Sequence, residues 1–153
     1  MKRFYFTQQQ WLPRSIDEVF GFFSDAHNLE RLTPSWLKFK VLTPDPIELK
    51  TGTLIDYQLR IRGIPLQWQS EITAWKPPYY FVDEQRRGPY KLWIHEHQFE
   101  ESAGGVSATD RVEYAVLGGA IINRLFISRD IERIFQFRKE MLEKIFAGPD
   151  STS

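Results

Sequence analysis

The chain has 153 residues, with 20 basic and 20 acidic side chains and no cysteine. This length fits one domain with a sizeable core, and the balanced charge gives no electrostatic case for binding nucleic acid or an acidic membrane surface. The lack of cysteine excludes disulfides, thiolate metal sites and thiol catalysis.

Residues 2–12 alternate between the two faces of an expected strand, which ends at Pro13. This segment has no long apolar core, so we do not expect a secretory signal. No later apolar run approaches the roughly 18 to 20 residues that span a bilayer. We therefore expect a cytoplasmic protein without stable membrane insertion.

Two short helices are expected next. Ser15 offers an N-cap, with Glu18 at capping-box spacing. The apolar face of this helix consists of Ile16, Val19, Phe20 and Phe23. A second short helix over about 26–32 should end before Pro34, because the residue preceding a proline disfavours the α conformation.

The middle of the chain predicts a meander of antiparallel strands. Period-two alternation and turn residues place these strands at about 36–42, 53–61, 64–74, 79–86, 88–101 and 105–117. A turn at 102–105 joins the last two strands, which are the longest pair.

From about residue 119 to 146 the pattern becomes helical, with one apolar stripe and a charged opposite side. At about 1.5 Å per residue such a helix is roughly 40 Å long. It is the only expected element long enough to cover the concave face of a curled sheet.

We therefore predict an α+β fold, in which a curved antiparallel sheet of six to seven strands wraps around a long C-terminal helix. Two short helices follow the first strand. Residues 1–147 should form a single domain, and the small, polar residues 148–153 a disordered tail.

Two histidines and an aspartate face the same side of the last two strands. Alternation groups His95 with His97, and places Asp110 on the matching face of the next strand. With a turn centred at 102 and 103, His95 lies opposite Asp110 and close enough to interact. This pair could be a satisfied polar contact in the core, a hydrogen-bonding group for a ligand, or an acid–base dyad for an enolisable ligand.

The chain is rich in aromatic side chains, with 12 Phe, 6 Tyr and 5 Trp, and these either fill a core or line a cavity. The best candidates for a cavity wall are Tyr57, Trp68, Trp93, Phe99 and Tyr114. Polar contacts to a ligand are predicted from His95, His97, Asp110 and Arg124. Arg124 and Arg138 lie in or beside the apolar helical stripe, where each either bonds a ligand carboxylate or, as we favour, extends to the rim.

We expect no metal and no cofactor. Zinc requires three or four ligands, and the remaining histidine, His27, is in a distant helical segment. Asp110 could add one ligand to His95 and His97, but no cysteine is present. The sequence also lacks a glycine-rich dinucleotide fingerprint.

Several motifs occur in a characteristic order. They are Ser15–Phe20, Asn28–Pro34, Gly88-Pro89-Tyr90, Trp93-x-His95-x-His97-x-Phe99 and Asp110-x-Val112-x-Tyr114. Together they resemble the SRPBCC superfamily, which includes START lipid-transfer domains, birch-pollen-allergen-like proteins and polyketide cyclases. Leu125-Phe126 followed by Ile131–Phe135 resembles a bacterial polyketide cyclase/dehydrase-like branch. The resemblance covers nearly the whole chain and implies a helix-grip fold with a hydrophobic cavity.

The resemblance does not carry a substrate, because members of this superfamily share a fold and differ in function. The leading hypothesis is binding of a small hydrophobic or aromatic metabolite, or a lipid-like molecule, between sheet and helix. One alternative is a polyketide cyclase/dehydratase-like enzyme that uses His95 and Asp110. Another is an interaction module that acts beside a partner enzyme.

Overall fold

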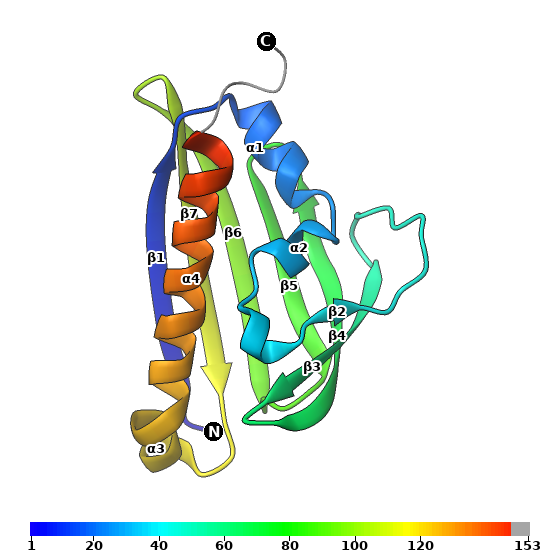
Figure 1. Cartoon of the computed structure of the whole chain (residues 1–153), viewed down its shortest axis with the longest axis vertical. Coiled ribbons are helices and arrows are strands. Elements are labelled where there is room, and N and C mark those ends of the chain that lie inside the picture. The colour runs from blue at the N-terminus through cyan, green and yellow to red at the C-terminus, as the bar shows by residue number, and fades with distance from the viewer. Residues whose placement is uncertain (148–153) are drawn as a thin grey trace.

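The computed structural model describes residues 1–147, and the tail predicted at 148–153 lies outside this range (Figure 1). Seven antiparallel strands form one sheet in the order β1-β7-β6-β5-β4-β3-β2. They are β1 (Phe4–Leu12), β2 (Lys40–Val41), β3 (Leu54–Ile61), β4 (Ile64–Lys76), β5 (Tyr80–Arg87), β6 (Leu92–Ser102) and β7 (Gly105–Ala115). The predicted curved sheet and long C-terminal helix are confirmed.

Most helical segments lie where the periodicity predicts them, but a 3₁₀ turn replaces part of a predicted strand, and a π-helical turn divides the helix predicted at 119–146. They are α1 (Ile16–Phe23), α2 (Asn28–Arg31), a 3₁₀ turn (Ser35–Leu37), α3 (Gly119–Ile122), a π-helical turn (Asn123–Ile127) and α4 (Ser128–Ala147). The Ser15 hydroxyl accepts a hydrogen bond from the Glu18 amide at 3.2 Å, which is the predicted N-cap. The strand predicted at 36–42 is wrong: the 3₁₀ turn takes its first half, and only Lys40–Val41 pairs with β3.

The long helix α4 lies along the β1–β7–β6 part of the sheet (Figure 1). Its predicted apolar stripe buries Ile131, Phe135 and Leu142 against residues of β7 such as Val106 and Val112. From β1, the amides of Gln8 and Gln10 donate to the backbone oxygens of Phe135 and Lys139 at 3.1 and 2.8 Å. These bonds fix the helix against one half of the sheet.

The other half of the sheet, β3 to β5, faces the segment that contains α2 (Figure 1). Ala26 and Val41 from that segment pack with Ile55 and Tyr57 of β3. The pairing of β4 with β5 shifts between Gln69 and Ser70 and again between Ile72 and Ala74. Such irregularities bend a sheet and increase its twist, so this half curves away from α4 and leaves space between the layers.

No helix within residues 1–147 is long and apolar enough to cross a membrane.

Candidate functional site

A cavity of about 200 Å³ occupies the space between α4, the α2 segment and the inner face of β3 to β6. Apolar and aromatic side chains form most of its wall, among them Tyr57, Leu59, Trp68, Trp93, Ile131 and Phe135. An engineered apolar cavity of about 150 Å³ binds benzene. The volume therefore suits a molecule of about one substituted ring.

Three rings make a rigid corner of this wall. Trp68 and Trp93 meet edge to face with centroids 5.4 Å apart, and Tyr90 contacts both, at 5.5 and 4.8 Å. The indole nitrogen of Trp68 donates to the Ser70 hydroxyl at 3.0 Å, which fixes its orientation. These rings contact one another directly, so they form one continuous aromatic part of the wall.

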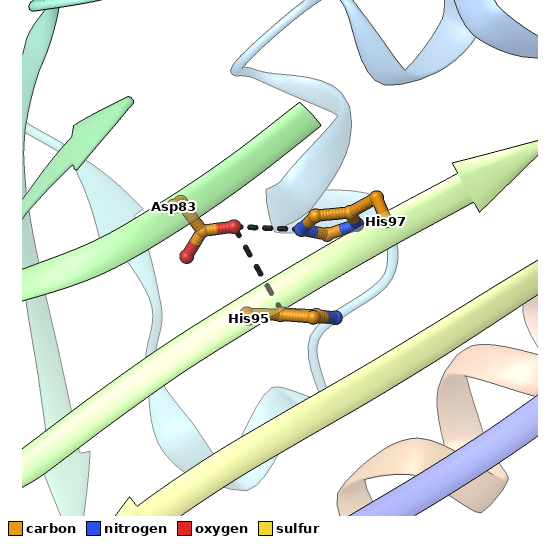
Figure 2. Close-up of side chains that lie close together, drawn as sticks. All are labelled: Asp83, His95 and His97. Atoms are coloured by element: carbon orange, nitrogen blue, oxygen red, sulfur yellow. Dashed lines mark hydrogen bonds and ion pairs between the residues drawn. The ribbon is translucent and has the colours of Figure 1, made fainter. Parts of the chain in front are cut away.

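A charged cluster interrupts the apolar wall where β5, β6 and β7 lie side by side. Nε2 of His95 donates to Oδ1 of Asp110 at 2.8 Å, and Nε2 of His97 bonds Oδ2 of Asp83 at 2.6 Å. Figure 2 shows Asp83 on its own strand, directed toward both imidazoles. His97 also stacks on Phe81, with centroids 3.9 Å apart and 9° between the planes. The two histidines are therefore fixed by neighbouring strands on both sides.

Arg138 of α4 completes the cluster from the helix side. Its Nη2 donates to Oδ1 of Asp110 at 3.2 Å and lies 3.5 Å from Nδ1 of His97. A guanidinium can only donate, so Nδ1 of His97 is the acceptor and its proton resides on Nε2, facing Asp83. Nε of Arg138 is buried without a hydrogen-bond partner within the described part of the chain.

Burial and neighbouring charges shift the pKa values of this cluster. Burial, and then the proximity of His95, lowers the pKa of His97 to about 4. Burial alone would raise the pKa of Asp110, but the Arg138 guanidinium and the bond from His95 outweigh it and hold that pKa well below its usual range. For Asp83 the same burial effect is outweighed by the bond from His97, so its pKa is also lowered. Both carboxyls are therefore ionised at neutral pH.

Residues 12–137 match the family model described as polyketide cyclase / dehydrase and lipid transport. The chain belongs to this family. No curated protein matches the chain. The predicted membership of the SRPBCC superfamily is thereby confirmed. The matched region runs from the last residue of β1 to the middle of α4.

Several solved structures share the fold of this chain, although their sequences are only distantly similar to it. Protein CV1439 from Chromobacterium violaceum is 14% identical, with a TM-score of 0.75 over 95% of this chain and 98% of that one. Protein Ms6760 from Mycobacterium smegmatis is 16% identical, with a TM-score of 0.70 over 94% and 90%. The ginseng major latex-like protein 151 from Panax ginseng is 12% identical, with a TM-score of 0.71 over 95% and 99%.

The structure brings only part of the predicted site to the cavity. Tyr57, Trp68, Trp93, His95 and His97 lie on its wall. Phe99 is buried instead among Phe20, Phe23 and Phe81 under α1, and the Tyr114 hydroxyl donates to Asn123 at 2.7 Å beneath the start of the C-terminal helix. Asp110 stands behind His95, away from the wall. Arg124 is exposed on the π-helical turn, which lies past the end of β7.

The predicted strand register is wrong by two residues. The turn is centred on Ala103 and Gly104, so His95 pairs with Val112 and His97 pairs with Asp110. The predicted contact between His95 and Asp110 nevertheless forms, because it runs diagonally across the two strands.

Arg138 also differs from the expectation of a side chain at the rim. It is only 5% exposed, because Asp110 neutralises it inside the protein and the rings of Phe23 and Phe135 lie 5.3 and 5.7 Å from its guanidinium carbon. An arginine held in this way does not need to reach water.

Sequence reasoning missed Asp83 as a member of the site. Asp83 of β5 pairs with His95 of β6. The alternation of polar and apolar residues does not specify the register between these two strands. The sequence does contain one indication of this role: on an alternating strand, Asp83 shares a face with the apolar Phe81. One charged group among inward apolar ones is the pattern that could have found it.

Asp83, His95 and His97 also offer three possible metal-ligand atoms within 4.8 Å of one another. The two imidazoles are stacked, however, with centroids 3.7 Å apart and 26° between their planes. A ring nitrogen binds metal in the plane of its ring, so stacked rings do not direct their lone pairs at one point. With the proton of Nε2 of His97 already bonded to Asp83, the group fits a hydrogen-bonded network better than a metal centre.

Proposed function

We propose that this protein binds a small apolar or aromatic molecule in the cavity between the sheet and α4. The observation that carries this proposal is a space of about 200 Å³ whose wall is mainly aromatic and aliphatic, with a few polar groups among the apolar ones. Binding sites for small molecules commonly combine an apolar wall with a few polar groups that orient the ligand. Membership of a family described by cyclase, dehydrase and lipid-transport activities supports the same conclusion.

The proposal is tested by native mass spectrometry and by displacement of a hydrophobic dye from the purified protein. Leu59 lines the cavity from β3, so Leu59→Trp should fill part of the space and abolish binding. Leu54→Trp is the matched control, because Leu54 lies on the same strand and is exposed. Absence of any bound apolar compound in the wild-type protein, or equal binding by Leu59→Trp, would overturn the proposal.

A second candidate function is acid–base catalysis on the bound molecule. His95 lines the cavity, donates from Nε2 to the ionised Asp110, and has no hydrogen bond at Nδ1 within residues 1–147. A carboxylate that fixes one tautomer leaves the other nitrogen able to accept a proton. On this hypothesis, His95→Gln keeps ligand affinity and loses turnover of a substrate. A parallel loss of stability and affinity would instead assign His95 a structural role.

A further inference from the structure

One carboxylate oxygen in the cavity has no partner. Oδ2 of Asp83 is bonded to His97, while Oδ1 has no hydrogen bond to any described residue. The Asp83 side chain is 21% exposed and lies on the cavity wall. An ionised oxygen among apolar groups is costly to leave without a donor, so the cavity provides an acceptor that a ligand can satisfy.

The charges around this oxygen determine which ligands it favours. The guanidinium of Arg138 also lies on the cavity wall, but its ion pair is with Asp110, so the charge of Asp110 offsets it and Asp83 has no guanidinium of its own. Arg138 is directed at Asp110, and His97 at Oδ2 of Asp83, so neither one covers Oδ1. A second negative charge brought to this place would meet like charge in a medium of low dielectric constant.

A second polar group on the same wall is also without a partner. The hydroxyl of Tyr57 makes no hydrogen bond within the described residues, although the side chain is buried. Burial, and then the charge of Asp83, raises the pKa of Tyr57, so its hydroxyl stays protonated and able to donate or accept. The cavity thus offers an anionic acceptor and a neutral hydroxyl, while most of its wall is apolar.

We propose that the ligand of this cavity carries a hydrogen-bond donor, either a hydroxyl or an ammonium group on a one-ring apolar body, and that Oδ1 of Asp83 accepts from it. The proposal rests on the proposed function, since it requires that the cavity binds a ligand. It excludes fatty acids and other carboxylates as the preferred class, and it makes Asp83 the residue that selects the polar end of the ligand.

The test uses four compounds that share one phenylpropyl body: propylbenzene, 3-phenylpropan-1-ol, 3-phenylpropan-1-amine and 3-phenylpropanoate. Their dissociation constants are measured from the fluorescence of Trp68 and Trp93, which line the cavity, and by calorimetry. In the wild-type protein, the alcohol or the amine should bind more tightly than the carboxylate. Whichever of the two binds more tightly identifies the donor as neutral or cationic.

Asp83→Asn removes the charge while its amide oxygen can still accept from His97. It should weaken binding of the preferred donor compound on the order of tenfold to a hundredfold, the range for a hydrogen bond to a charged group. Binding of propylbenzene should be unchanged. Asp56→Asn is the matched control, because Asp56 is on the outer face of β3 and should leave all four constants unchanged.

Tyr57→Phe is a second variant that removes no internal hydrogen bond. It keeps the ring and the fold, and it should weaken binding of the alcohol while leaving propylbenzene unaffected. Thermal unfolding of each variant shows whether it is folded.

The outcomes separate the two proposals. If propylbenzene binds but Asp83→Asn leaves the alcohol and amine unchanged, or if the carboxylate binds best, the assignment of Asp83 is overturned and the cavity function stands. If none of the four compounds binds the wild-type protein and the dye screen is also negative, the binding function itself fails.

Discussion

The two halves of the sheet have the same alternating sequence pattern and different interiors. On the β1–β7–β6 half, inward residues such as Val106 and Val112 are packed against α4 and are fully buried. On the β3–β4–β5 half, inward residues such as Tyr57 and Trp68 face a cavity. The two interiors differ because different elements lie opposite the inward faces. Helix α4 is fixed to the first half of the sheet, and the second half curves away from this helix.

The charged cluster lies at the boundary between these halves. Asp110 belongs to the packed side, whereas Asp83, the histidines and Arg138 reach the cavity wall, where Arg138 is bonded to Asp110. A polar group in the packed half needs a protein partner. In the cavity half the same kind of group is available to a ligand. Four predictions test this contrast.

The largest effect is expected from removing the internal partner of Arg138. Asp110→Ala leaves a buried guanidinium without its carboxylate, which should lower the free energy of unfolding by about 3–5 kcal/mol. Glu113→Ala on the same strand is the control, because its pair with the half-exposed Arg3 is screened by solvent and should contribute little to stability. Urea unfolding measures both.

The double variant Asp110→Leu with Arg138→Leu replaces the whole pair by apolar groups, and it should recover most of that stability. A double variant as unstable as Asp110→Ala would show that the loss comes from packing rather than from the unpaired charge.

Leucine truncation compares the two interiors directly. Leu142→Ala opens a void in the packed half, and Leu59→Ala only enlarges a cavity that already exists. Within the range of about 2–5 kcal/mol for such changes, Leu142→Ala should lie near the top and Leu59→Ala near the bottom. Chemical denaturation gives the two values. Equal losses would mean that the two halves are packed alike.

The third prediction concerns acid. The pKa of His97 is about 4 in the folded protein and 6.5 in an ordinary histidine, so between these pH values the unfolded chain binds a proton that the folded protein does not. Stability should therefore fall by roughly 1–3 kcal/mol as the pH drops through that window. Below it, the lowered pKa values of Asp83 and Asp110 extend the loss, because their stabilising charged forms become protonated.

Unfolding curves at pH 7, 5.5 and 4.5 measure this slope. His97→Phe should flatten the slope between pH 6.5 and 4, because phenylalanine can stack on Phe81 without titrating. His27→Gln should leave the slope between pH 5.5 and 4.5 unchanged, because the bond to Asp45 raises the pKa of His27 and this histidine is protonated there in both the folded and the unfolded chain. The same slope in His97→Phe would contradict the assignment.

The smallest effect is expected from filling the cavity. Leu59→Trp enters unoccupied volume and should change stability by less than about 1 kcal/mol, whereas Leu142→Trp forces a large ring into a packed core and should cost about 3 kcal/mol or more. Thermal unfolding of the two variants tests this, and a costly Leu59→Trp would show that the cavity has no room for another ring.

The sequence predicted the fold because fold-level information is local and repeated. The alternation of β3 to β7, the capping box at Ser15 and the apolar stripe of α4 each depend on neighbours within a few residues. The strand predicted at 36–42 failed where alternation was short and Pro34 preceded it. The contact of His95 with Asp110 was predicted from a turn position that proved one residue off, which shifts the register by two residues, and the diagonal geometry still allowed the contact.

By itself the sequence determined which side chains point inward, and it indicated a helix long enough to cover the sheet. Only the tertiary structure decided that Asp83 meets His97, that Arg138 is buried against Asp110, and that Phe99 and Tyr114 pack away from the cavity. Alternation assigns a residue to a face of its own strand. The curvature of the sheet and the position of α4 decide whether that face meets protein or a space that a ligand can fill.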